Sequence, residues 1–546
     1  MERFYYITML LMLSACSGNW ITVTDDPVTD DPEDEDGITV VDGTISIVYA
    51  SDGATVSGDE LGIVSVKGNE VTVINTSESC FTYELSGTAS DGFFKLYSDA
   101  KQTISLKNLS LTNPDGAAIN NQSHKYTSVI VSGTNFLADG SVNSSGAYND
   151  ESSDEDMKAA FFSERQLIFS GDGSLTVTAA GKSGIVSDDY IRIMETPTIT
   201  VSSSAKNGVK GKDRVVIDGG TLEISVSAAG AKGLKSEGNG YFNAGTVKVT
   251  NTGTSSGIGG RPGFGGWGST TDDSSSKAAK AIKFDGDIYF NGTDVTATAA
   301  SHEAIEAKGS ISISAGSVSA TSSDDAINSG SDMTITGGNV SAFSSGNDGL
   351  DANGNMYIKG GYIYAVGSGS PEVALDANSE GGYKLYISGG KLVAFGGIES
   401  GSSITQPVIN VTSWTANASY TLCDTDGTEL LKFTAPARGG NGMILSHPDL
   451  VSGNSYTLKS GSSSASVPAT MSSSGSAGGG QGGGGFPGGG WRTGRPSLTY
   501  GAKKKRIAAL FALAKSSQPE GCCGFPFTER LALHLFLHPL PSSVIT

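Results

Sequence analysis

The chain has 546 residues, a formal net charge of −20, 76 glycines and only 8% aromatic residues. The segment from Trp491 onward carries a net charge of +6, so residues 1–490 carry −26. A body this acidic excludes non-specific nucleic-acid binding, which needs a basic face for phosphate contacts, and it suits calcium binding or solubility outside the cell. The spacing of the five cysteines indicates neither a zinc site nor a disulfide framework.

The first predicted segment, residues 1–16, is an export signal. Met1-Glu2-Arg3 precedes an apolar run that ends in Leu13-Ser14-Ala15-Cys16. This arrangement resembles the signal and lipobox of bacterial lipoproteins, which implies lipidation of Cys16 and a place on the outer membrane or cell surface. An ordinary secretion signal is the alternative. No later segment reaches the roughly 18 apolar residues that a spanning helix needs, so we expect the acyl chains to be the only membrane anchor.

An acidic tether and a set of opening strands follow the signal. Residues 17–36 contain the acidic run and are predicted to be extended. Short strands begin at Gly37, and we expect them to form the first coils and to cap the sheet edge. Residues 141–157 hold five acidic residues and predict a loop.

Between residues 161 and 397 one pattern returns every 22 to 25 residues, apart from a single interval of 48. A fixed period of this size predicts a solenoid. Residues 215–224 have the pattern of a strand, a glycine turn and a second strand. This pattern indicates that the coils of the solenoid consist of β-strands rather than helices. The long interval is one period plus an insertion. A two-sheet sandwich is the alternative, but the steady phase disfavours it. The anchor of the pattern is a small residue before an aliphatic one, at Gly184-Ile185, Gly208-Val209, Gly233-Leu234, Ala281-Ile282, Ala304-Ile305, Ala326-Ile327, Gly349-Leu350 and Ala374-Leu375.

Stacked coils place equivalent residues in columns about 4.8 Å apart. Inward columns should be aliphatic, and a corner that needs positive φ should select glycine in each coil. One predicted inward column is Ile217, Ile313, Ile335, Ile358 and Ile387, and another is Leu222, Val247, Val318, Val340 and Ile363. The predicted corner glycines are Gly220, Gly245, Gly316, Gly338, Gly361 and Gly390.

The remaining segments differ from the repeat. The insertion from Thr254 to Ser276 carries Trp267 and other aromatics that could stack on sugar rings, or that could pack on the nearest coil. These segments give the expected domain organisation: a β-helix over 37–403, a small β module over 404–468, a Gly/Ser-rich linker over 469–490 and an atypical basic tail over 491–546. The tail is typical of a frameshifted or spurious extension, and we assign it no function.

The outward columns carry charge. Two positions after the anchor the residues are Lys210, Lys235, Lys283, Glu306, Asn328, Asp351 and Asp376. Directly before the anchor they are Asn207, Lys232, Lys280, Glu303, Asp325 and Asp348. Like charges about 5 Å apart repel, so each block should attract a counter-ion.

For the acidic block the natural counter-ion is calcium, which accepts about six to eight oxygens in flexible geometry. The alternative is that Asp and Asn simply suit turns. The candidate calcium ligands are Glu303, Glu306, Asp324, Asp325, Asn328, Asp348 and Asp351.

For the basic block we expect the carboxylates of a uronic-acid polymer, which repeats its charge as the column does. The alternative is a solvated face whose lysines pair with neighbouring acids. The candidate polysaccharide-binding residues are Lys210, Lys232, Lys235, Lys280, Lys283 and Trp267. The sequence supports no Ser-His-Asp or Cys-His pair and no phosphate loop.

Residues 324–328 (Asp-Asp-Ala-Ile-Asn), residues 347–351 (Asn-Asp-Gly-Leu-Asp) and the recurrent Ile-x-Gly-Gly corners resemble the bacterial carbohydrate-binding β-helix family, long filed as a domain of unknown function. Residues 83–92 and 113–119 resemble its N-terminal pattern. The resemblance implies an all-β, right-handed, pectate-lyase-like parallel β-helix with bound calcium and affinity for plant-wall polysaccharides such as polygalacturonate and cellulose. It places calcium at the corners of Asp324, Asp325 and Asp348, but not over coils 208–283, which have Asn or Lys there.

Three functions follow as hypotheses. The first is a surface lipoprotein that binds acidic polysaccharide with the help of calcium. The second is a calcium-dependent polysaccharide lyase, in which Lys283 or Lys308 would be the base, although nearby carboxylates raise the pKa of a lysine and disfavour that role. The third is an adhesin or structural spacer that binds no glycan. We expect a binder rather than an enzyme.

Overall fold

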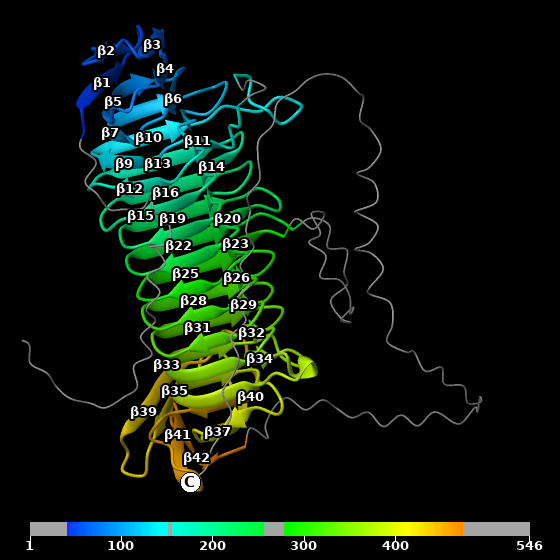
Figure 1. Cartoon of the computed structure of the whole chain (residues 1–546). Helices are drawn as coiled ribbons and strands as arrows, with labels where there is room; N and C mark the ends of the chain where they lie inside the picture. The colour runs from blue at the N-terminus through cyan, green and yellow to red at the C-terminus, as the bar shows by residue number, and fades with distance from the viewer. Residues whose placement is uncertain (1–40, 151–154, 256–277, 473–546) are drawn as a thin grey trace, which may run out of the picture. The chain divides into compact units, whose positions relative to one another are not determined.

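The computed structural model describes residues 41–150, 155–255 and 278–472, all of which belong to one compact unit. The predicted signal with Cys16, the acidic tether, Trp267, the end of the linker and the basic tail lie outside the described residues. In the described part the chain winds through repeated coils of β-strand (Figure 1).

Each coil presents a strand on each of three faces, and strands of neighbouring coils pair in parallel. Face 1 is a sheet of 13 strands in the described residues, parallel except for the β3–β4 pair. Face 1 consists of β3 (Val64–Lys67), β4 (Glu70–Asn75), β6 (Phe93–Ser98), β8 (Ile119–Asn121), β11 (Ala159–Ser163), β14 (Ser183–Ser187), β17 (Val209–Gly211), β20 (Lys232–Ser236), β23 (Lys280–Phe284), β26 (Ile305–Ala307), β29 (Ile327–Ser329), β32 (Leu350–Ala352) and β34 (Leu375–Ala377).

Faces 2 and 3 belong to a second sheet that also includes strands at both ends of the described unit. Face 2 consists of β1 (Gly43–Tyr49), β5 (Phe81–Ala89), β7 (Gln102–Thr112), β9 (Thr127–Ser132), β12 (Leu167–Ser170), β15 (Tyr190–Ile193), β18 (Arg214–Ile217), β21 (Asn239–Phe242), β24 (Ile288–Phe290), β27 (Ile311–Ile313), β30 (Met333–Ile335), β33 (Met356–Val366), β35 (Leu385–Phe395) and β36 (Ser403–Ile404). Face 3 consists of the second halves of β5, β7, β33 and β35 together with β10 (Thr134–Ala138), β13 (Ser174–Ala179), β16 (Thr198–Ser203), β19 (Thr221–Val226), β22 (Thr246–Asn251), β25 (Asp294–Ala299), β28 (Ser317–Ser322) and β31 (Asn339–Ser344).

The repeat read from the sequence is the repeat of the structure. The aliphatic residues of the eight anchors pair in register along face 1, from Ile185 with Val209 to Leu350 with Leu375. Leu234 pairs with Ile282, so the interval of 48 residues is one coil with an insertion. The prediction of a parallel β-helix is therefore confirmed.

The core lies inside the coils, and both predicted inward columns are in register. Phe242 and Phe290 fill the two positions between Ile217 and Ile313 in the isoleucine column. Val295 fills the position between Val247 and Val318 in the second column. These side chains are almost fully buried. The six predicted corner glycines all have positive φ, between 65° and 82°, which confirms the reason for their recurrence.

Antiparallel strands close both ends of the described unit. β2 (Thr55–Ser57) pairs with β1, and β3 pairs with β4. After the last coil, which carries the short 3₁₀ helix η1 (Ser379–Gly381) between β34 and β35, β40 pairs with β35. The C-terminal strands are β37 (Val408–Trp414), β38 (Ser419–Cys423), β39 (Glu429–Thr434), β40 (Gly440–Ser446), β41 (Ser455–Ser460) and β42 (Ser463–Thr470). The closing strands remove edges that would otherwise pair with other chains.

Candidate functional site

The predicted charged column runs along the outer side of face 1. Each of its members pairs with the next through the strand register, from β17 to β34. Strand residues alternate between the two sides of a sheet, so the aliphatic anchors point into the core and these polar side chains point outward. We call Lys210, Lys235, Lys283, Glu306, Asn328, Asp351 and Asp376 the face 1 ladder. The ladder changes sign where Lys283 lies beside Glu306.

At the basic end, two ladder lysines already have carboxylate partners. Lys210 Nζ lies 2.7 Å from Glu237, and Lys283 Nζ lies 2.9 Å from Asp285. Sequence reasoning named neither acid as a partner, because both lie in the turns that follow the face 1 strands rather than in the ladder. The expected block of lysines is thus partly neutralised by the protein itself.

Lys232 and Lys235 are different. No carboxylate of the described residues forms an ion pair with either, and Lys232 Nζ donates to the carbonyl of Gly230 at 2.9 Å. Burial, together with the charges of the neighbouring lysines, lowers the pKa of Lys232 to about 8. Burial and the charges of Lys210 and Lys283 also lower the pKa of Lys235. Nearby carboxylates offset part of this lowering of the pKa values, from Glu306 at Lys232 and from Asp285 and Glu237 at Lys235, but none forms an ion pair with either lysine. These two side chains are therefore the ones on which a ligand carboxylate could act.

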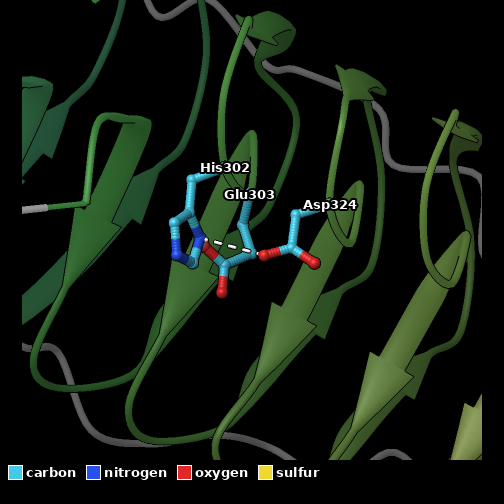
Figure 2. Close-up of side chains that lie close together, drawn as sticks. All are labelled: His302, Glu303 and Asp324. Atoms are coloured by element: carbon cyan, nitrogen blue, oxygen red, sulfur yellow. Dashed lines mark hydrogen bonds and ion pairs between the residues drawn. The ribbon is translucent and has the colours of Figure 1, made fainter. Parts of the chain in front are cut away.

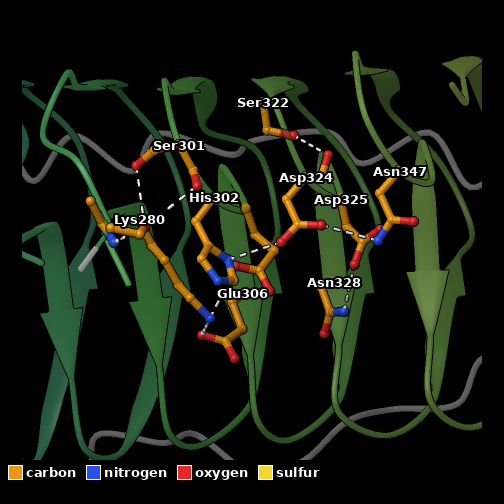
Figure 3. Close-up of polar contacts among 12 residues, drawn as sticks. Lys280, Ser301, His302, Glu306, Ser322, Asp324, Asp325, Asn328 and Asn347 are labelled. Atoms are coloured by element: carbon orange, nitrogen blue, oxygen red, sulfur yellow. Dashed lines mark hydrogen bonds and ion pairs between the residues drawn. The ribbon is translucent and has the colours of Figure 1, made fainter. Parts of the chain in front are cut away.

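Lys280 corrects one expectation. It pairs with Lys232 in register, but it is buried, and its Nζ lies 2.5 Å from Glu306 (Figure 3). The same Nζ lies 3.1 Å from Glu303. Burial alone would lower the pKa of Lys280, but the two glutamates outweigh it and raise the pKa. Lys280 is thus the counter-ion of Glu303 and Glu306, and it is not accessible to a polymer.

A polar junction follows on the next coils. His302 Nδ1 is hydrogen-bonded to Glu303 and lies 3.1 Å from Asp324 (Figure 2). The three possible ligand atoms lie within 4.8 Å of one another. Burial would raise the pKa of Glu303, but the hydrogen bond with His302 and the charge of Lys280 lower it to about 2. These contacts satisfy Glu303 without a metal ion.

The acidic end has no such compensation. No Lys, Arg or His of the described residues forms an ion pair with Asp325, Asp348 or Asp351. The Asn328 amide donates to Asp325 at 3.1 Å and to Asp351 at 2.7 Å, and the Asp348 amide donates to Asp325 at 3.0 Å. We call Asp325, Asp348 and Asp351 the acidic cluster.

Burial is the first cause of the raised pKa of each carboxyl in the acidic cluster. Asp325 and Asp348 are only 5% and 6% exposed. The charges of Asp351 and Asp324 add to the effect at Asp325. The pKa of Asp348 rises to about 8, and Glu372 and Asp351 contribute to that rise. Buried carboxyls that repel one another in this way are held at a cost that a bound cation would remove.

Acidic residues beyond the predicted ligands adjoin this end. Burial and a hydrogen bond with Glu399 raise the pKa of Asp376, the last member of the ladder. Glu372 lies close enough to Asp348 to form a hydrogen bond that raises its pKa. Sequence reasoning missed Glu372 and Glu399 because neither occupies a repeated position of the coil.

In the described residues no helix is both long and apolar enough to span a membrane. Comparison with solved structures finds a likeness to a polysaccharide lyase-like protein from C. thermocellum, in its gadolinium derivative. The two share 22% identity over 46% of this chain and 94% of that chain, with a TM-score of 0.33, too low to argue function. No curated protein matches the chain.

The family model of carbohydrate-binding domain-containing proteins matches residues 67–349. This range includes the basic end of the ladder, Asp325 and Asp348. Since it spans more than half of the chain, this protein belongs to the carbohydrate-binding domain-containing protein family.

Proposed function

We propose that this protein binds an acidic polysaccharide, a uronic-acid polymer such as polygalacturonate, along the face 1 ladder and the adjoining column that holds Lys232. The observation that carries the proposal is the pair of lysines without carboxylate partners, Lys232 and Lys235. Charge-assisted hydrogen bonds to carboxylates are among the stronger polar contacts in proteins. Burial and mutual repulsion lower the pKa values of these two lysines, and a carboxylate placed between them would favour their charged forms.

The spacing of the coils supports a polymer rather than a single sugar acid. Side chains of neighbouring coils repeat about every 4.8 Å along the axis, and a polyuronate carries a carboxylate on every sugar, so one polymer can meet side chains of several coils at once. The polymer would lie along the axis of the coils, with its carboxylates toward the side chains of Lys232, Lys235 and Lys210.

Calcium is the proposed cofactor at the acidic cluster. The donor set fits, because Asp325, Asp348 and Asp351 offer carboxylate oxygens, which calcium prefers, and no cation of the described residues neutralises them. A bound calcium ion would supply positive charge for the carboxylates of the protein and the polymer. Glu303 and Glu306 fit less well, since Lys280 already neutralises both.

The proposed location is the cell surface, with the chain anchored through a lipidated Cys16. The support is the lipobox-like sequence that ends in Cys16. Labelled palmitate fed to expressing cells should enter the wild-type chain and not the Cys16→Ser variant. Equal labelling of both would reject the anchor.

The binding proposal is tested by titrating the full chain with polygalacturonate in the presence of calcium. Replacing Lys232 and Lys235 together by Ala should weaken binding roughly tenfold to a hundredfold, because two charge-assisted contacts are lost. Lys248→Ala is the matched control, because Lys248 is an exposed lysine on face 3. Equal affinity of the double variant and the control would reject the ladder as the binding surface.

A polysaccharide lyase is the second candidate, favoured by one observation. Lys283 and Lys308 share Asp285 as an ion partner, whereas the pKa of Lys232 is lowered to about 8, which suits a general base. In such a reaction the base takes the proton at C5 of the uronate and the bond from C4 to the glycosidic oxygen breaks. The oxygen leaves with a proton, and the resulting C4–C5 double bond absorbs ultraviolet light. Absorbance that rises with wild type and not with Lys232→Ala would establish the lyase, whereas no rise with wild type would reject it.

A further inference from the structure

Face 2 carries an outward column of a different kind from the face 1 ladder. The register of β21, β24, β27, β30, β33, β35 and β36 aligns one outward side chain from each strand. The aligned side chains are Tyr241, Tyr289, Ser312, Thr334, Tyr357, Tyr386 and Ser403. None of them is charged, over the same coils on which face 1 is strongly charged.

The tyrosines form two stacked pairs. The ring centroids of Tyr241 and Tyr289 lie 5.2 Å apart with an interplanar angle of 5°, and those of Tyr357 and Tyr386 lie 5.0 Å apart at 11°. All four side chains are half-buried. Within each pair one face of each ring is covered by the other ring, so the opposite face is turned away from the partner. Lys359 Nζ lies 5.0 Å from the ring centroid of Tyr357.

Small side chains lie beside the inner ring of each pair. Ser312 is the register neighbour of Tyr289, and Thr334 is the register neighbour of Tyr357. Neither side chain is large enough to cover an aromatic ring. The two pairs therefore stand three strand spacings apart, about 14 Å, with the hydroxyl side chains of Ser312 and Thr334 between them.

Polar side chains fix the first pair at its edge. Asn239 donates to the hydroxyl of Tyr241 at 3.1 Å, and the hydroxyl of Tyr289 donates to Asp287 at 3.1 Å. Asn239 and Asp287 are in turn held by backbone amides of the following coils, from Asp287 and Ser310. The rings are thus oriented before any ligand arrives, which lowers the entropic cost of binding.

This combination suits the faces of sugar rings. The axial C–H groups of a pyranose carry partial positive charge, which meets the negative π-face of a tyrosine ring, while amides and carboxylates at the edge accept or donate hydrogen bonds to sugar hydroxyls. Asp287 and Asp332, which adjoin the column, would repel a polyuronate, whereas Lys359, whose Nζ lies 5.0 Å from the ring centroid of Tyr357, would attract one. Because charges of both signs adjoin the column, the stacked rings set the ligand, and they point to an uncharged polymer.

We propose that face 2 is a second carbohydrate-binding surface, on which Tyr241, Tyr289, Tyr357 and Tyr386 stack against the pyranose rings of an uncharged polysaccharide. It goes beyond the proposed function, because it assigns a separate face and a different class of polymer. Membership of a carbohydrate-binding family supports a sugar as the occupant of this face.

The experiment titrates the full chain with cellohexaose, an uncharged hexasaccharide, and in parallel with polygalacturonate. Replacing Tyr357 and Tyr386 by Ala should weaken cellohexaose binding about tenfold or more and leave polygalacturonate binding unchanged. Tyr383→Ala is the matched control, because Tyr383 is 42% exposed and lies outside the column.

A second variant guards against loss of stability in the tyrosine variant. Ser312→Glu leaves both pairs intact, places a charged side chain between them, and should also reduce cellohexaose binding about tenfold. The proposal is overturned if wild type does not bind cellohexaose, or if Ser312→Glu binds it like wild type. If the tyrosine variant loses thermal stability but still binds cellohexaose, the tyrosine pairs only stabilise the packing of the coils and the proposal is rejected. Since polygalacturonate is measured in the same preparations, failure of face 2 is distinguishable from failure of face 1.

Discussion

At the scale of single residues, Lys232 and Lys280 show how burial and ion-pair partners decide whether a lysine stabilises the fold or stays available to a ligand. Lys232 and Lys280 are register neighbours on β20 and β23. Lys280 is buried between two glutamates and its pKa is raised, whereas Lys232 has no carboxylate partner among the described residues and its pKa is lowered. The same residue type at the same position of the repeat thus has opposite electrostatic roles.

The lowered pKa of Lys232 predicts a pH dependence of binding. Only the protonated ammonium attracts a carboxylate, and with a pKa of about 8 Lys232 loses its proton well below the usual range for lysine. Affinity for polygalacturonate should therefore fall between about pH 7 and about pH 9, where the polymer itself does not titrate. Lys232→Arg keeps its charge and should flatten the titration curve; an unchanged fall in that variant would remove Lys232 from the account.

Lys280 gives a prediction about the stability of the fold rather than about binding. Lys280→Met leaves the half-buried Glu306 without a counter-ion and the buried Glu303 with His302 alone, so the free energy of unfolding should fall by about 3–5 kcal/mol in chelator. Chemical denaturation of the variant beside Lys248→Met measures the difference. A loss no larger than that of the exposed control would show that the two glutamates do not depend on Lys280.

At the scale of elements, the corner between faces 2 and 3 depends on glycine. Gly338 has a φ of 75°, and a Cβ there would lie 2.9 Å from the carbonyl oxygen of Gly316 on the preceding coil. Gly338→Ala should therefore lower the free energy of unfolding by about 1–3 kcal/mol. Gly43→Ala serves as control, because its Cβ would make only an ordinary contact, 3.4 Å from Phe81, and equal effects of the two substitutions in chemical denaturation would contradict the argument.

The repeated elements are what the sequence predicts best. Anchors, inward columns and corner glycines recur once per coil, so register follows from counting, as the pairing of Leu234 with Ile282 across the insertion shows. Glu237 and Asp285 were not predicted as partners, because they lie in the turns after the face 1 strands, outside the two columns read from the sequence, and Glu372 occupies no repeated position of the coil. The tyrosine column was missed because Ser312 and Thr334 interrupt it.

At the scale of the whole molecule, in-register stacking gives the described solenoid two outer faces of different chemistry. Face 1 changes from basic to acidic along its length, and face 2 presents tyrosines and hydroxyls over the same coils. The closing strands at both ends leave these faces, rather than the sheet edges, as the surfaces for ligands.

Removal of calcium should lower the stability of the whole fold. A chelator should lower the melting temperature of the full chain by about 2 °C or more, because the acidic cluster then lacks its proposed counter-ion. Replacing Asp325 and Asp348 together by Asn should abolish the response to calcium and, in chelator, should raise the melting temperature, since buried repulsion is relieved. Asp294→Asn, on the exposed outer side of face 3, should behave as wild type. Identical melting of wild type with calcium and with chelator would exclude calcium from the site.

The central claim is that equivalent side chains, aligned coil above coil, hold a polymer along the axis. A crystal structure of the full chain with trigalacturonate and calcium tests it most directly. We expect sugar carboxylates about 3 Å from Nζ of Lys232 and Lys235, with the oligomer parallel to the axis of the coils. An oligomer bound on another face, or running along the strands instead of across them, would contradict the account.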